Sequence, residues 1–204
     1  CTISDEAQNN FPNQDQRYAF CNSQYQQNNT SGFKAYRGQT PRHYSTRTET
    51  YMGQRHIVAP VVLMVEGVHC GSGGPTLYTA DELAKYPAAW NGRPVPVYHP
   101  EVEGQPISCN DPNVIESQCV GQVFNTYFDE STNKLRGEVW INEQQARSIA
   151  PGIVNRLNQG LEIEVSTGVF TEDEFVSGNW HGEEYNKVAR NLRPDHLALL
   201  PGEQ

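Results

Sequence analysis

From His56 onwards, the apolar residues of this chain occur in short blocks separated by turn-forming residues. The longest near-continuous apolar run is Ile57–Val65, which Pro60 interrupts. Residues 161–166 alternate between apolar and polar, a pattern that predicts a strand with one buried face. A membrane-spanning helix needs about 20 consecutive apolar residues. The pattern therefore predicts a strand-rich domain and argues against a transmembrane helix.

Turn and capping signals divide this part of the chain into elements. Residues 129–133 have the composition of a hairpin turn. A capping box at 79–82 predicts a helix to about Trp90, and Asn142 and Pro151 predict the starts of two more helices. The expected strands, about seven, lie at residues 57–65, 94–98, 120–128, 135–141, 161–170, 185–192 and 196–200. Taken alone, the pattern indicates a fold that mixes α and β structure.

Residues 1–55 have a different character from residues 56–204. Twelve of the first thirty residues are Asn or Gln, and the only apolar face is a short helix expected around residues 14–26. A segment of this composition cannot bury a core of its own. We therefore predict a polar N-terminal extension over 1–55, either docked on a partner or on the main domain, or disordered, and a folded domain over 56–204.

Charge and cysteine content restrict the class of protein. The 204 residues carry 15 Lys and Arg against 24 Asp and Glu, a net charge of −9, with no basic stripe for nucleic acid. The five cysteines form no CxxC pair. The odd number favours free, mostly buried thiols in a reducing compartment, with a Cys1–Cys21 bridge as the alternative. The first thirty residues lack the apolar segment of a secretory signal.

Three segments carry side chains that could perform catalysis. Ser166 ends an alternating strand just before a glycine, where a hydroxyl can act as a nucleophile beside backbone N–H groups. His99 follows an apolar strand and precedes Pro100, and a proline disfavours a helical conformation for the residue before it. This extended position suits His99 to act as a general base. His196 begins another apolar strand and could orient that base.

Each of these residues also has a purely structural interpretation. A serine at a strand end can simply bond to the backbone, and a histidine there can be a hydrogen-bonded structural residue. Asp195 precedes His196, and neighbouring strand residues point to opposite faces. We therefore do not expect Asp195 and His196 to face the site together.

The chain resembles the prohead proteases of tailed bacteriophages, capsid-maturation serine proteases related to the herpesvirus assemblins. The resemblance covers about 57–204 and lies in WNGRPVPVYHP around His99, LEIEVSTGVF around Ser166 and RPDHLALLPG around His196. Residues 66–100 contribute most of its specificity. It implies that Ser166 is the nucleophile, His99 the base and His196 the third member. It also implies an α+β fold with a mainly antiparallel, barrel-like core of about seven strands surrounded by short helices.

The resemblance implies a serine endopeptidase without cofactor or metal. Its substrates would be the scaffold or major capsid protein precursor, and itself, in a procapsid assembled in the bacterial host cytoplasm. No nucleic acid or membrane is expected as a direct partner, and a homo-oligomer is one option. The chain departs from assemblins in reading Gly202-Glu203-Gln204 where they have Gly-Arg-Arg. Arg190 and Arg193 are candidate substitutes, and a non-catalytic, protease-like structural component of the virion is the alternative.

Two further groups of residues have alternative interpretations. Zinc-ligand types occur at His69, Cys70, His99, Cys109, Cys119, His181 and His196. No pair among them shows tight ligand spacing, so a zinc module is the weaker hypothesis. The acidic run at residues 172–174 could bind a basic partner, but a solvated loop is the simpler interpretation.

Overall fold

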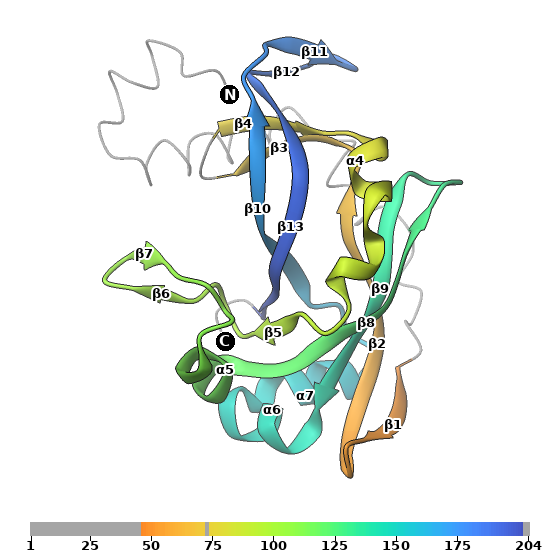
Figure 1. The fold of residues 1–204 in the computed structure, drawn as a ribbon. Helices are drawn as coiled ribbons and strands as arrows, with labels where there is room; N and C mark the ends of the chain where they lie inside the picture. The colour runs from red at the N-terminus through yellow and green to blue at the C-terminus, as the bar shows by residue number, and fades with distance from the viewer. Residues whose placement is uncertain (1–45, 72–73, 202–204) are drawn as a thin grey trace. The chain divides into compact units, whose positions relative to one another are not determined.

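The computed structural model describes residues 46–71 and 74–201, which form two compact units (Figure 1). The larger unit contains residues 46–65, 83–170 and 192–201, and the smaller unit contains residues 66–71, 74–82 and 171–191. The predicted helix at 14–26, the Cys1–Cys21 bridge and most of the predicted extension lie outside the described residues. Within that extension, only its last ten residues are described.

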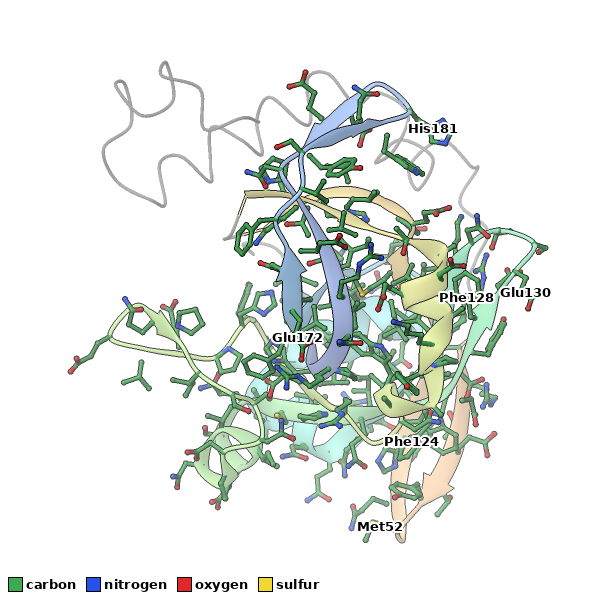
Figure 2. All side chains as sticks on the ribbon, turned by 45° about the horizontal axis from the view of Figure 1, so that its top comes forward. Met52, Phe124, Phe128, Glu130, Glu172 and His181 are labelled. Carbon is green, nitrogen blue, oxygen red and sulfur yellow. The ribbon has the colours of Figure 1, made fainter. Side chains whose placement is uncertain are left out.

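The larger unit is built on a five-stranded antiparallel sheet with the strand order β1-β2-β9-β8-β5. Its strands are β1 (Arg47–Tyr51), β2 (Gln54–Val65), β5 (Pro94–Pro96), β8 (Cys119–Asp129) and β9 (Lys134–Asn142). Met52 lies at the tip of the β1–β2 hairpin and Glu130 at the tip of the β8–β9 hairpin (Figure 2). Strand β1 of this sheet lies within residues 1–55, the segment predicted as an N-terminal extension.

Two helices pack against this sheet and close its core (Figure 1). They are α6 (Glu143–Ile149) and α7 (Pro151–Asn158), as the capping signals predicted. The Asn142 side chain accepts the N–H of Gln145, and Pro151 occupies the first turn of α7, where its missing N–H costs nothing. Along β9, every second residue is buried, which explains the alternation seen in the sequence.

After His99 the chain forms a hairpin and a helix. The hairpin consists of β6 (Glu101–Val102) and β7 (Gln105–Pro106), and it projects away from the sheet in Figure 1. It closes where the N–H of Ile107 donates to the carbonyl of Pro100, at 3.1 Å. Helix α5 (Pro112–Gln118) follows, with Asp111 as its N-cap.

The smaller unit has its own core and its own network of charges. It contains β3 (Gly67–Gly71), β4 (Gly74–Tyr78), β11 (Gly178–Trp180) and β12 (Glu183–Tyr185). Its buried core residues are Val68, Leu77 and Val188. The acidic run at 172–174 belongs to a strand here and not to a loop. Within it, Asp173 pairs with Lys187 at 2.5 Å. This pairing places a positive charge beside the Asp173 carboxylate within the strand.

The threonine of the predicted capping box caps a helix. The N–H of Glu82 lies 3.4 Å from the Thr79 hydroxyl oxygen, at the start of α4 (Ala80–Lys85). The Glu82 carboxylate also accepts the N–H of Asn191 at 2.9 Å. The helix ends at Lys85, and a 3-10 turn, η1 (Pro87–Trp90), completes the segment predicted as one helix.

Two long strands, β10 (Glu164–Glu174) and β13 (Lys187–Leu200), contribute residues to both units. They belong to a four-stranded sheet with the order β10-β13-β4-β3, in which β13 and β4 are parallel. Strand β13 is continuous where two strands were expected.

The α+β class predicted from the resemblance is confirmed. The described residues form thirteen strands rather than about seven, and none of their sheets closes into a barrel. The expected barrel-like core is therefore not confirmed. Among the helices of residues 46–71 and 74–201, none is both long and apolar enough to cross a membrane.

Candidate active site

Ser166 lies near the start of β10, in the part of that strand that belongs to the larger unit. Its side chain is half-buried, and its Oγ lies 2.8 Å from Nε2 of His99. This distance lies within the range expected for a hydrogen bond, which a nucleophilic hydroxyl would need to its base. The structure therefore brings together the first two residues singled out from the sequence.

His99 is positioned by its attachment to β13. Val97 forms a parallel bridge with Leu199, and the N–H of Tyr98 donates to the carbonyl of Leu199 at 3.0 Å. Tyr98 has a φ of +64°, a left-handed conformation that is uncommon for an aromatic residue. Since such conformations persist only where the surroundings impose them, the pairing with β13 fixes the direction in which the chain enters His99.

His196 lies behind His99 and is 5% exposed, whereas His99 is accessible to solvent. Its Nε2 is 2.7 Å from Nδ1 of His99, and the two rings meet edge to face. The three residues predicted to act together are thus joined in the order Ser166, His99, His196. The order runs from a half-buried hydroxyl to a buried imidazole.

Gly168 makes room for the buried imidazole. It lies two residues after Ser166 on β10, so both residues belong to the same face of the strand. A Cβ atom at position 168 would overlap the His196 ring. The sequence signal for this contact was a glycine inside a strand, which often marks a close approach. From the sequence, this glycine was noted only because it lies close after Ser166. Its contact with His196 was not anticipated.

The prediction that Asp195 and His196 would not face the site together is wrong. Oδ2 of Asp195 lies 2.7 Å from Nδ1 of His196, and Asp195 is 5% exposed. The rule of alternating faces fixes the directions of the two Cα–Cβ bonds, not the positions of the polar atoms beyond them. Neighbouring side chains on a strand can therefore still form a hydrogen bond with each other, as these two do.

The environment of His99 favours its neutral form. Partial desolvation of the ring lowers the pKa of His99 from its ordinary 6.5, and the neighbouring His196 lowers it further. A neutral imidazole is the form that can accept a proton from a hydroxyl. The hydrogen bond between His99 and Ser166 and the lowered pKa of His99 are both compatible with a base and its nucleophile.

The two arginines considered as substitutes for the Gly-Arg-Arg element differ in their surroundings. Arg190 belongs to the smaller unit, where its guanidinium pairs with Glu174 at 2.7 Å and lies 3.8 Å from Glu82. These contacts do not favour a role at Ser166. Arg193 lies on β13 within the larger unit and is exposed, so its role stays a prediction. Residues 202–204, where assemblins have Gly-Arg-Arg, lie outside the described residues.

The cysteine and histidine residues considered for zinc do not gather into a metal site. Across residues 46–71 and 74–201, no group of three or more His, Cys, Asp or Glu is arranged to hold a metal ion. Cys109 and Cys119 are buried free thiols with their sulfurs 3.2 Å apart, and Cys70 is partly buried. Buried free thiols were predicted, and these two cysteines agree with that prediction.

No protein-family model, curated protein or solved structure matches this chain.

Proposed function

We propose that this protein is a serine endopeptidase of the prohead-protease type. In this proposal it cuts the scaffold or the major capsid protein precursor, and itself, within a phage procapsid in the bacterial host cytoplasm. The supporting observation is the hydrogen-bonded series from Ser166 through His99 to His196. The capsid substrate, the location and an assemblin-like, barrel-like core come from the resemblance of the three segments that carry these residues.

The proposed reaction is acyl transfer in two halves. Ser166 Oγ attacks the peptide carbonyl while its proton passes to Nε2 of His99. The C–N bond then breaks, and His99 returns that proton to the leaving amine. In the second half, a water molecule attacks the acyl-enzyme and gives a proton to His99. The Oγ–C bond breaks, and Ser166 regains its proton as the second product leaves.

A fluorophosphonate probe tests the nucleophile without knowledge of the substrate. The Ser166 Oγ–P bond should form as the P–F bond breaks, and peptide mapping should find the label on Ser166. Since protonated His99 cannot accept a proton, the labelling rate should rise with pH and then level off. Because the pKa of His99 is lowered, the half-maximal rate should lie below pH 6.5.

Label on another residue, or a rate independent of pH over this range, would contradict the proposed mechanism. A folded protein that takes up no label would favour the alternative function, a protease-like structural component of the virion.

The Gly168→Ala variant tests the packing behind the base. An added methyl group would push the His196 ring out of place and move His99 with it. Misplacement of a catalytic group by about 1 Å costs roughly 100-fold in rate, which is the fall in Ser166 labelling that we expect. Thr167→Ala, on the opposite face of β10, is the matched control and should label as fast as the wild type. Equal rates for the alanine variants at 167 and 168 would show that this contact does not matter.

A further inference from the structure

The carboxylate of Asp195 is enclosed by hydrogen-bond donors. Its Oδ2 accepts from His196 Nδ1 at 2.7 Å and from the Cys109 N–H at 2.8 Å. Its Oδ1 accepts from the Ser108 hydroxyl at 2.5 Å and from Asn110 Nδ2 at 2.7 Å. Each oxygen therefore accepts two hydrogen bonds, and Ser108, Cys109 and Asn110 form a cradle of three consecutive residues.

The β6–β7 hairpin explains how this cradle reaches the site. His99 comes immediately before the residue that opens the hairpin, and Ser108 follows the residue that closes it. The closing bond between Pro100 and Ile107 therefore ties the position of the base to that of the cradle. Both ends of the hairpin meet β13 at the neighbouring residues Asp195 and His196.

An ionised carboxylate can only accept hydrogen bonds, and this fixes every proton in the series. His196 must carry its proton on Nδ1, so its Nε2 presents a lone pair to His99. His99 must then donate through its own Nδ1, which leaves its Nε2 free to accept the Ser166 proton. With the opposite tautomers, His99 Nε2 would carry a proton and could not act as the base.

We propose that Asp195 is a positioning residue of this site, held by Ser108–Asn110, and that it sets the tautomers of His196 and His99. This inference rests on the proposed peptidase function. When the Ser166 Oγ–H bond breaks and the proton binds His99 Nε2, the His99 Nδ1 proton can shift to His196 Nε2. The imidazolium then faces the Asp195 carboxylate, which stays ionised throughout. The series Ser166, His99 and His196 thus ends at the negatively charged carboxylate of Asp195 and not at a neutral imidazole ring.

The charges around Asp195 agree with this role. Burial raises the pKa of the Asp195 carboxyl, but the hydrogen bonds from His196 and the cradle outweigh it, so the pKa is lowered. Titratable groups near Asp195 include the Cys109 and Cys119 thiols, and the hydrogen bond with Cys109 lowers the pKa of Cys119. The hydrogen bond with Cys119, together with burial, raises the pKa of Cys109, so its thiol is neutral at neutral pH.

The ring nitrogens of the wild-type full-length chain provide the first test. Long-range ¹H–¹⁵N spectra at pH 8 should show the proton on Nδ1 in both His99 and His196. A proton on Nε2 of His196 would overturn the proposal. This measurement does not depend on catalysis or on a variant that folds. If the tautomers are as expected but the probe does not label Ser166, the peptidase proposal fails while the positioning by Asp195 stands.

The Asp195→Asn variant provides the second test. An amide has one acceptor atom, so two of the four donors would face an NH₂ group. We expect the rate of fluorophosphonate labelling to fall roughly 10- to 100-fold. Loss of the negative charge should also move the half-maximal pH lower, by about one pH unit. Asp111→Asn, which keeps a capping acceptor in the same loop, is the matched control. Labelling of Asp195→Asn at the wild-type rate with an unchanged midpoint would overturn the proposal.

Discussion

Replacing Ser166 with alanine should abolish labelling by the fluorophosphonate and reduce acyl transfer from an activated p-nitrophenyl ester on the order of 10⁶-fold. The proposed mechanism has no other group that can form the covalent intermediate. The variant should remain folded, because Ser166 is half-buried and its side chain bonds only to His99 within the described residues. The free energy of unfolding should therefore change by about 1 kcal/mol at most.

Ser148→Ala is the matched control, since Ser148 is exposed on α6. It should retain the wild-type rate in both assays. A purified capsid or scaffold precursor then tests the substrate class, because wild-type protein should cut it and the Ser166→Ala variant should not. If Ser166 is labelled but the precursor is not cleaved, the hypothesis of a hydrolase stands and that of a capsid substrate is rejected. Equal cleavage by both proteins would remove Ser166 from the mechanism.

Local signals predicted the parts of the fold that depend on neighbouring residues. The turn at 129–133 joins β8 and β9 as expected, and Asn142 and Pro151 begin the two helices that they predicted. In each case the bonds that define the element span only a few residues. The sequence within that span is therefore sufficient to specify it.

Strand β13 shows where a local rule fails. The sequence predicts two strands, at 185–192 and 196–200, and Pro194, which has no N–H to donate, lies between them. The structure instead has one strand, and Pro194 is buried within it. Pro194 follows the part of β13 that pairs with β4 at Lys187 and Val188. The N–H that Pro194 lacks is therefore not needed for the pairing of β13 with β4.

The candidate site was predictable in part. The order of His99, Ser166 and His196 followed from resemblance, whereas their hydrogen bonds depend on residues up to 97 positions apart. Asp195 was dismissed on a local rule, and its partner Cys109 lies 86 positions away. The fit of four donors around one carboxylate is a property of the packed molecule, so no short segment of sequence carries a signal for it.

Replacing Gly121, in the sheet of the larger unit, with alanine should cause a large loss of stability. Gly121 lies on β8 between β9 and β5, opposite Ile141 and Val95. A Cβ atom there would overlap the carbonyl oxygen of Trp140 and lie 2.9 Å from its carbonyl carbon. These atoms belong to the backbone of a central strand, so they cannot move aside without breaking the sheet. We expect Gly121→Ala to lower the free energy of unfolding by about 3 kcal/mol.

Thermal unfolding measures this effect, and the melting temperature should fall by about 6–12 °C. Gly137→Ala is the graded control. Its added Cβ would lie 2.8 Å from a methyl group of the Thr126 side chain and 3.2 Å from the backbone oxygen of Phe124, a looser contact with backbone than at Gly121. The loss of stability at Gly137 should therefore be the smaller of the two. If both variants had the melting temperature of the wild type, the strands β8 and β9 could not lie as close together as they do in this structure. The alignment that carries β5 toward His99 would then be in question as well, because β5 pairs with β8 at this same glycine.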